Sequence, residues 1–222
     1  DRPMHQPTTQ ARPSIYYTYE VFKPWLASQH PAQKRQKVVI AGSGPAGMVT
    51  ALELARHGVP SVVLTSELQL TQGSRAICFT RRSMEILQQV GVADRMTEGG
   101  LPWRFGNSYY RGQRVFRMEA PHDADDRFFP IINVQQQYME EYLHDACRAQ
   151  PLIDFRWGNR GEKVTQKEGH AELVVDTPTG EYVLETDWLI DASGGRSAIR
   201  TAMDLQMEGA SYEGFFVIAD IK

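Results

Sequence analysis

The sequence has little of what marks a disulfide-bonded, metal-binding or membrane-spanning protein. Only two of its 222 residues are cysteines, Cys78 and Cys147, and they form no CxxC or Cys/His ligand spacing. Neither a disulfide framework nor a zinc site is therefore expected. No apolar run approaches the ~18 residues of a membrane-spanning helix, so neither a signal peptide nor a membrane anchor is predicted. These absences favour a reducing compartment, and we expect a cytoplasmic protein.

Further absences exclude other classes of function. The 24 Lys and Arg residues are balanced by 27 Asp and Glu residues, and no basic stripe with interleaved aromatic residues indicates nucleic-acid binding. The six histidines show no HExxH or paired spacing, so no metal site is predicted. No GxSxG motif indicates a hydrolase. What remains, with 41% hydrophobic residues, is a globular chain long enough for one large domain and a fraction of a second.

A strand, a glycine-rich turn, a helix and a second strand follow one another from residue 38 onwards. Residues 38–41 (VVIA) form an apolar run typical of a buried parallel strand, and residues 61–64 form another. Between them, apolar residues recur at helical spacing until Gly58 closes the helix. This order is that of a nucleotide-binding α/β unit with a parallel sheet.

The turn itself, residues 42–47 (GSGPAG), carries the GxGxxG pattern. Gly42 is expected to permit the tight turn, Gly44 to let the backbone approach a pyrophosphate, and Gly47 to let the helix pack on the strand. The helix N-terminus then offers free N–H groups and a positive dipole end to an anion, and Pro45 costs no hydrogen bond there. A glycine-rich turn without a ligand is the alternative. The predicted cofactor-binding residues of this motif are Gly42, Ser43, Gly44, Pro45, Ala46 and Gly47.

An acidic residue is expected about 20 positions further on, where it would hydrogen-bond ribose hydroxyls. The second strand instead ends at Thr65, and the carboxylate arrives two residues later as Glu67. Glu67 either reaches the adenosine ribose from the loop or is a solvated loop charge, and both interpretations stay open.

Periodicity and turn residues predict the remaining elements. Helices are expected over residues 80–90 and 135–148, with short strands between them and a turn at Arg111, Gly112 and Gln113. Beyond residue 151 the pattern becomes extended. The later elements expected are a hairpin of strands 172–176 and 182–185, a separate buried strand at 188–190, a short helix through Arg200 and a final strand at 215–221.

The segments 73–79 (GSRAICF) and 81–91 (RRSMEILQQVG), following GxGPAG, resemble the N-terminal half of the flavoprotein aromatic hydroxylases, the class of p-hydroxybenzoate and phenol hydroxylases. The sequence GSRAICF is most similar to the same segment in members that act on hydroxyphenylpropionate-like or chlorinated phenols. The resemblance extends from about residue 38 to residue 222. It implies FAD as the cofactor and NAD(P)H as a transient co-substrate.

The resemblance assigns two more cofactor residues. The arginine of the GSRA segment contacts FAD in the family, which corresponds to Arg75 here, although an arginine paired to a nearby acid is the alternative. A family glutamine opening a helix corresponds to Gln136, and the flanking Gln135 and Gln137 leave the register open.

A third family motif, DGxxSxxR after a strand, is altered in this chain. Residues 193–200 read SGGRSAIR, so Ser193 replaces the acid while the adjacent Gly194 persists. Ser193 and Gly194 are carried over as cofactor contacts, and Asp191 is a candidate substitute for the missing acid. Arg200 is either part of the motif or a helix surface charge.

The resemblance implies a Rossmann-like α/β FAD-binding domain with a parallel sheet, plus the start of a mixed-sheet substrate domain. Residues 1–37 are expected to form an N-terminal arm, partly mobile, or a disordered leader; the arm is rich in aromatic residues, which favours packing over the domain. Residues 38–210 would form the FAD-binding domain, with inserted strands at about 102–130, and residues 211–222 the first strand of a truncated substrate domain.

The implied function is an FAD-dependent monooxygenase that hydroxylates a small phenolic or aromatic substrate with NAD(P)H and O2. This chain would be its N-terminal part, inactive alone, with a missing C-terminal half or a second copy as partner. No catalytic residue can be assigned. The alternatives are a flavin-dependent reductase or halogenase of the same fold, favoured by the turn at residues 191–194 (DASG), or a non-catalytic FAD- or nucleotide-binding half of a split protein.

Overall fold

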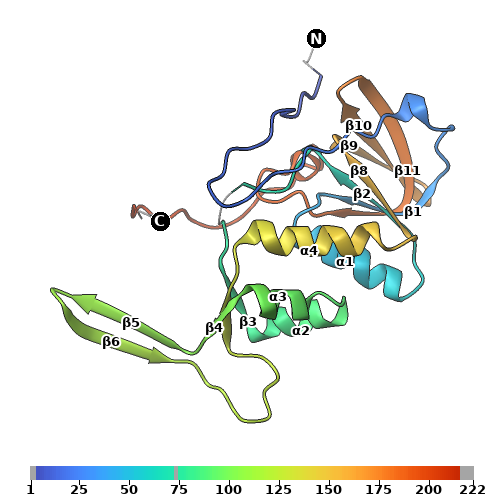
Figure 1. Ribbon diagram of the computed structural model, residues 1–222. Helices are drawn as coiled ribbons and strands as arrows, with labels where there is room; N and C mark the ends of the chain where they lie inside the picture. Colours follow the sequence, from blue (N-terminus) through green and yellow to red (C-terminus); the bar gives the residue numbers. More distant parts are fainter. Residues whose placement is uncertain (1–3, 73–74, 216–222) are drawn as a thin grey trace.

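A six-stranded mixed sheet forms the centre of the molecule in a computed structural model that describes residues 4–72 and 75–215 (Figure 1). Four neighbouring strands are parallel, and two antiparallel strands extend one edge. In spatial order the strands are β8 (Ile153–Trp157), β2 (Ser61–Thr65), β1 (Gln36–Ala41), β11 (Gly180–Asp191), β10 (His170–Thr177) and β9 (Arg160–Lys167).

Two apolar cores cover the two faces of this sheet. Alternate residues of β1 point to opposite faces, so Val38 and Ile40 belong to one core while Val39 and Ala41 belong to the other. The first core includes residues of all four larger helices, and the second packs against the short helix α5 (Ala198–Ala202). The larger helices are α1 (Pro45–Arg56), α2 (Arg81–Gln89), α3 (Ala93–Gly99) and α4 (Gln136–Arg148).

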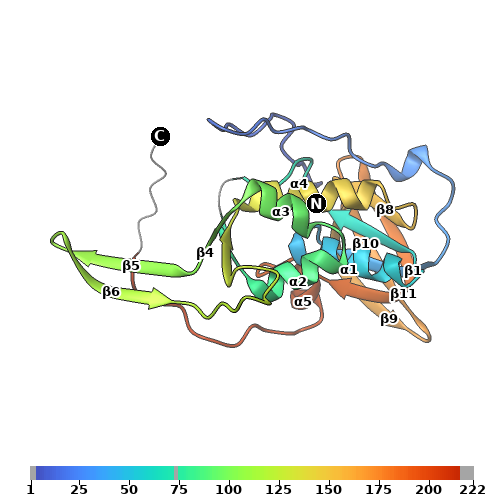
Figure 2. The same cartoon turned by 60° about the horizontal axis from the view of Figure 1, so that its bottom comes forward.

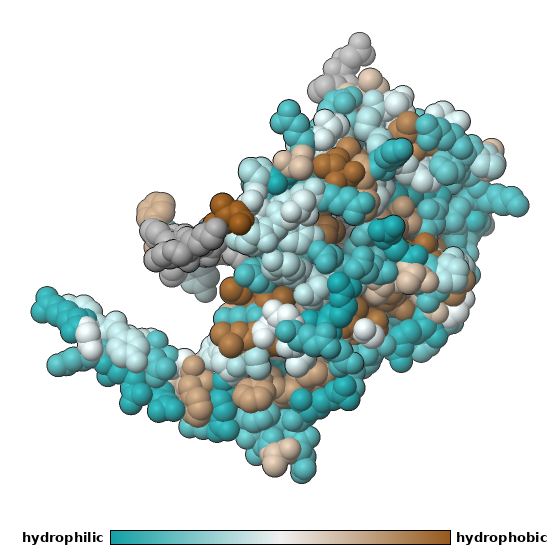
Figure 3. All heavy atoms as spheres, in the orientation of Figure 1, coloured by the Kyte–Doolittle hydropathy of each residue, from teal (hydrophilic) through white to brown (hydrophobic). Residues whose placement is uncertain are grey.

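Short strands on either side of α2 and α3 form two smaller sheets. One joins β3 (Cys78–Thr80), β7 (Ile131–Asn133) and β4 (Leu101–Trp103). The other is a hairpin of β5 (Phe105–Tyr110) and β6 (Gln113–Glu119) that projects far from the body (Figures 1 and 2). Figure 3 shows mostly hydrophilic side chains along this hairpin on the face displayed.

The predicted turn of this hairpin is confirmed. Arg111 and Gly112 have φ values of 49° and 78°, so both central residues lie in the left-handed region. This is the type I′ geometry, whose twist matches that of the two strands it connects.

One prediction about the sheet needs correction. Residues 188–190 do not form a separate buried strand, because β11 runs without interruption to Asp191 and Trp188 is 67% exposed. The long strand changes partner along its length: its first part pairs with β10, and Thr186 to Asp191 pair with β1. The sheet of the domain is therefore mixed, with four parallel strands. The predicted final strand lies almost wholly outside the described residues.

The N-terminal arm lies against the carboxyl end of the sheet in the described part of the chain. Phe22 stacks on Trp157 with ring centroids 4.3 Å apart. The backbone N–H groups of Phe22 and Trp25 donate to the carbonyl oxygens of Leu68 and Trp157, at 2.7 and 2.9 Å. A 3-10 turn, Ala27–Gln29, then leads towards β1. The partial mobility of the arm stays a prediction. Among the described residues, no helix combines the length and apolar character needed to cross a membrane.

A cluster of aromatic side chains under the arm encloses His144. Because this histidine is buried, we expect the protein to lose stability in acid. His144 is 3% exposed and lies 4.9 Å from the rings of Phe22 and Phe155. Burial, with a smaller contribution from the charge of Arg148, lowers the pKa of His144 from 6.5 to about 4. Between these values the unfolded chain binds a proton that the folded protein excludes, so the free energy of unfolding falls as pH drops, by about 2–3 kcal/mol at pH 4.5.

Urea unfolding of the wild type and of His144→Phe at pH 7 and pH 4.5 tests this expectation. Phenylalanine keeps an aromatic ring in the cluster and does not titrate, so the variant should lose less stability in acid than the wild type. Equal losses for the two proteins would show that another group is responsible.

Candidate functional site

A cavity of about 760 Å³ opens where the parallel strands end. Its wall includes Ala41, Thr65 and Trp157, the last residues of β1, β2 and β8, together with Ala192 directly after β11. In open α/β sheets, ligands bind in the crevice outside the carboxyl ends of the strands. The volume is within the range of small-molecule and cofactor sites.

Ten of the eleven residues predicted from the sequence line this one cavity. The exception is Gly47, a buried residue in the first turn of α1. The ten are Gly42, Ser43, Gly44, Pro45, Ala46, Glu67, Arg75, Gln136, Ser193 and Gly194.

The three glycines of the turn have different tasks. Gly42 has a φ of 113°, and a Cβ atom there would lie 2.3 Å from the carbonyl oxygen of Ala192. A Cβ on Gly47 would lie 1.9 Å from the carbonyl oxygen of Gly42, so the helix packs on the strand only because residue 47 has no side chain. Gly44 is different, because a Cβ there would meet nothing within 4 Å.

Gly44 borders the cavity as the N-cap of α1, and Pro45 is the first helical residue. The first N–H groups of a helix have no partner within it and carry the positive end of its dipole. At Gly44 the cavity is therefore bordered by backbone without a side chain, next to a helix N-terminus that attracts an anion. These residues fit the pyrophosphate of a dinucleotide.

Gln136 is the member of the glutamine triplet that borders the cavity. Its Nε2 donates to Oε1 of Glu140 at 2.7 Å, and the Thr71 N–H donates to the other oxygen of Glu140 at 3.0 Å. Burial raises the pKa of the Glu140 carboxyl, although these hydrogen bonds and the charges of Arg75 and Arg12 oppose the rise. Gln137 is fully buried and Gln135 is the N-cap of α4.

Glu140 also lines the cavity and was not assigned from the sequence. Its position four residues after Gln136 on one helix face is the signal that would have found it.

Glu67 is ion-paired in this structure, and its side chain remains 44% exposed. Its Oε2 accepts from the guanidinium of Arg12 at 2.8 Å. Arg12 and His5, both from the N-terminal arm, line the cavity beside Glu67. His5 approaches the Ser66 carbonyl oxygen with its Nε2 at 2.5 Å. No motif pointed to these two residues, because the arm lies outside the strand, turn and helix pattern.

The turn after β11 is organised by Asp191, which does not itself line the cavity. Its carboxylate accepts from the N–H and hydroxyl of Ser193 and from the Ser197 hydroxyl. Burial raises the pKa of Asp191, but these hydrogen bonds and the charge of Arg200 outweigh burial and hold it below its ordinary value. Arg200 donates to the carbonyl oxygen of Gly195 at 2.8 Å. Both Asp191 and Arg200 thus hold the turn that presents Ser193 to the cavity.

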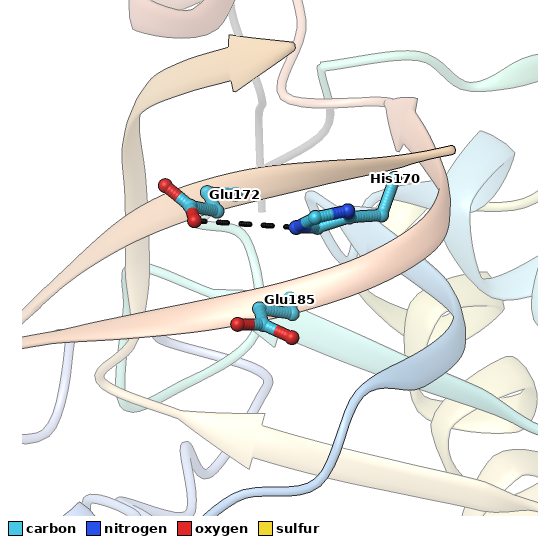
Figure 4. Close-up of side chains that lie close together, drawn as sticks. All are labelled: His170, Glu172 and Glu185. Carbon is cyan, nitrogen blue, oxygen red and sulfur yellow. Dashed lines mark ion pairs between the residues drawn. The ribbon is translucent and has the colours of Figure 1, made fainter. Parts of the chain in front are cut away.

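A second polar cluster lies at the opposite end of the sheet, on the outer face of β10 and β11. Figure 4 shows His170, Glu172 and Glu185 close together, with their ligand atoms within 4.8 Å of one another. Sequence spacing did not reveal this group because Glu185 comes from the neighbouring strand, directly opposite Glu172. Lys167 lies 3.4 Å from Glu172, so an ammonium group already balances that carboxylate. We therefore interpret the cluster as a network of surface ion pairs.

Comparison with known proteins agrees with the geometry of the cavity. A family profile described as FAD binding domain matches residues 35–221. The chain is 28% identical over 205 residues to the FAD-dependent monooxygenase apdD of Emericella nidulans, covering 83% of this chain and 33% of that protein. It is 28% identical over 194 residues to 3-(3-hydroxy-phenyl)propionate/3-hydroxycinnamic acid hydroxylase 2 of Burkholderia vietnamiensis, covering 86% of this chain and 35% of that protein.

A solved structure, the flavin-dependent monooxygenase PieE in complex with FAD and substrate, superposes with a TM-score of 0.71 and 28% identity, over 80% of this chain and 33% of PieE. The chain thus spans about a third of the length of these relatives. Because the family profile covers most of its residues, including the backbone around Gly44, the chain belongs to the FAD-binding domain family.

Proposed function

We propose that the complete polypeptide is an FAD-dependent monooxygenase that hydroxylates a small phenolic or aromatic substrate with NAD(P)H and O2, and that this chain provides its FAD-binding part. The observation that carries the proposal is the convergence of ten predicted cofactor residues on one cavity. The functions of the relatives support the reaction class, since one of them is a 3-(3-hydroxy-phenyl)propionate/3-hydroxycinnamic acid hydroxylase. We further propose a cytoplasmic location, supported by two free cysteines.

The residues of the cavity would divide the work of holding FAD. The backbone around Gly44 and the N-terminus of α1 would bind the pyrophosphate, and Arg75 would add a positive charge at the same cavity. Gln136, fixed by its hydrogen bond to Glu140, would contact the cofactor with the remaining polar atoms of its amide. Bound FAD supplies the redox and oxygen chemistry, and the protein binds and orients it.

NAD(P)H oxidation by the complete polypeptide tests the proposal. We expect purified protein to carry FAD, and phenolic acids such as hydroxyphenylpropionate to stimulate NAD(P)H oxidation with formation of a hydroxylated product. Non-aromatic carboxylic acids of similar size serve as the control. A protein that retains FAD but forms no hydroxylated product from any phenol tested would favour the reductase, halogenase or binding alternatives.

A further inference from the structure

The N-terminal arm lies outside the region matched by the family profile, which begins at residue 35. The structure nevertheless places part of this arm in the cavity wall. Figure 1 shows the arm, in dark blue, beside the segment that follows β2. His5 and Arg12 contribute side chains to the cavity, next to Glu67 and Gln69 of that segment.

A buried amide fastens the arm at this place. Gln69 is only 2% exposed, and its Oε1 accepts from the backbone N–H of Arg12 at 2.9 Å. Its Nε2 donates to the carbonyl oxygen of Gln10, also at 2.9 Å. Both the oxygen and the nitrogen of this amide are hydrogen-bonded to the backbone of the arm. If the arm moved away, these buried polar atoms would have no partner, which is unfavourable. The arm is therefore packed on the domain through specific hydrogen bonds.

Arg12 continues this attachment into the cavity. One of its guanidinium nitrogens donates to the Leu70 carbonyl oxygen, and another lies 2.8 Å from Oε2 of Glu67. The side chain is only 20% exposed. The cavity still measures about 760 Å³ with Arg12 in place, so the arm forms a wall of the cavity and leaves room for a large ligand.

The positive charge of Arg12 compensates negative charge in this part of the cavity. Glu67 and Glu140 both line a cavity that would hold the two negative charges of the FAD pyrophosphate. Arg12 pairs with Glu67, and its charge also acts on Glu140. Without Arg12, the Glu67 carboxylate would be uncompensated next to an anionic ligand, and like charges in a partly desolvated site repel.

We propose that the N-terminal arm is a retaining strap for FAD, in which Arg12 closes the Glu67 end of the cavity and neutralises that carboxylate. The proposal rests on FAD binding in this cavity. It makes Arg12 a positioning residue that lies outside the region matched by the family profile.

The rate of FAD dissociation from the complete polypeptide, followed by flavin fluorescence, tests the strap. Arg12→Ala should release FAD about tenfold faster than the wild type, because a charge-assisted pair is lost and a carboxylate is exposed to the cofactor. The double variant Arg12→Ala/Glu67→Gln should recover most of the retention, since glutamine keeps a hydrogen-bond acceptor without the charge. Arg82→Ala is the matched control, because it removes a surface ion pair with Glu85 outside the cavity.

Each result decides a different point. An Arg12→Ala rate equal to that of the wild type, or slower, would overturn the strap, and a slower rate would mean that the arm competes with FAD. A double variant that releases FAD as fast as Arg12→Ala would overturn the role of charge. Gly44→Val, measured in parallel, separates these failures from a failure of the FAD site itself, because that variant should lose FAD whatever the arm does.

Discussion

Gly47→Ala is expected to lower the free energy of unfolding by about 3 kcal/mol or more, a large effect for the addition of one methyl group. The new Cβ would lie 1.9 Å from the Gly42 carbonyl oxygen and 3.4 Å from Cγ2 of Ile40. The oxygen belongs to the backbone and cannot turn away as a side chain would. Gly42 cannot retreat freely either, since it is itself packed against the backbone of Ala192. Helix α1 would have to move off the sheet.

The sign of this effect is the opposite of that expected from helix propensity. Alanine normally stabilises a helix interior by about 0.5–1 kcal/mol relative to glycine. Gly44→Ala, three residues earlier in the same turn, is the matched control, because its Cβ meets nothing within 4 Å and should cost less than about 1 kcal/mol. Chemical denaturation of both variants measures the difference. A Gly47→Ala protein as stable as Gly44→Ala would refute the close contact between helix and strand.

Local patterns were enough to predict the part of the site built from one contiguous segment. A buried strand, a glycine-rich turn and a helix follow one another directly in the chain. Residues 42–47 could therefore be placed at the end of β1 from the sequence alone. Gln136 and Ser193 come from distant segments, and only the resemblance to a family could connect them to that turn. The structure brings them to the same cavity.

The features that the sequence did not predict depend on long-range pairing. β11 changes partner near Thr186, and an alternating pattern contains no signal for such a change. Arg12 lies in a segment without periodicity, and its contact with Glu67 joins residues 55 positions apart. Asp191 was a candidate substitute for the missing acid by sequence position, but the sequence did not reveal that its carboxylate accepts hydrogen bonds from Ser193 and Ser197 within the turn.

Gly44→Val is expected to weaken FAD binding at least about 100-fold while leaving the free energy of unfolding within about 1 kcal/mol of the wild type. The backbone of Gly44 has a φ of −67°, which valine adopts without strain, and there is open space around the position. That open space belongs to the cavity, so the valine methyl groups would occupy the volume where the pyrophosphate approaches the N-terminus of α1.

Equilibrium titration of the flavin-free protein with FAD measures this loss, and denaturation of the same samples measures stability. Gly106→Val is the matched control, because a Cβ at Gly106 would make only ordinary contacts of 3.5 Å or more and Gly106 lies in β5, outside the cavity. We expect Gly106→Val to bind FAD as the wild type does. If Gly44→Val bound FAD with wild-type affinity, the pyrophosphate site at the α1 N-terminus would be contradicted. This would hold even if other residues of the cavity proved necessary for FAD binding. Loss of both FAD and stability would instead mean that Gly44, like Gly47, is required for packing.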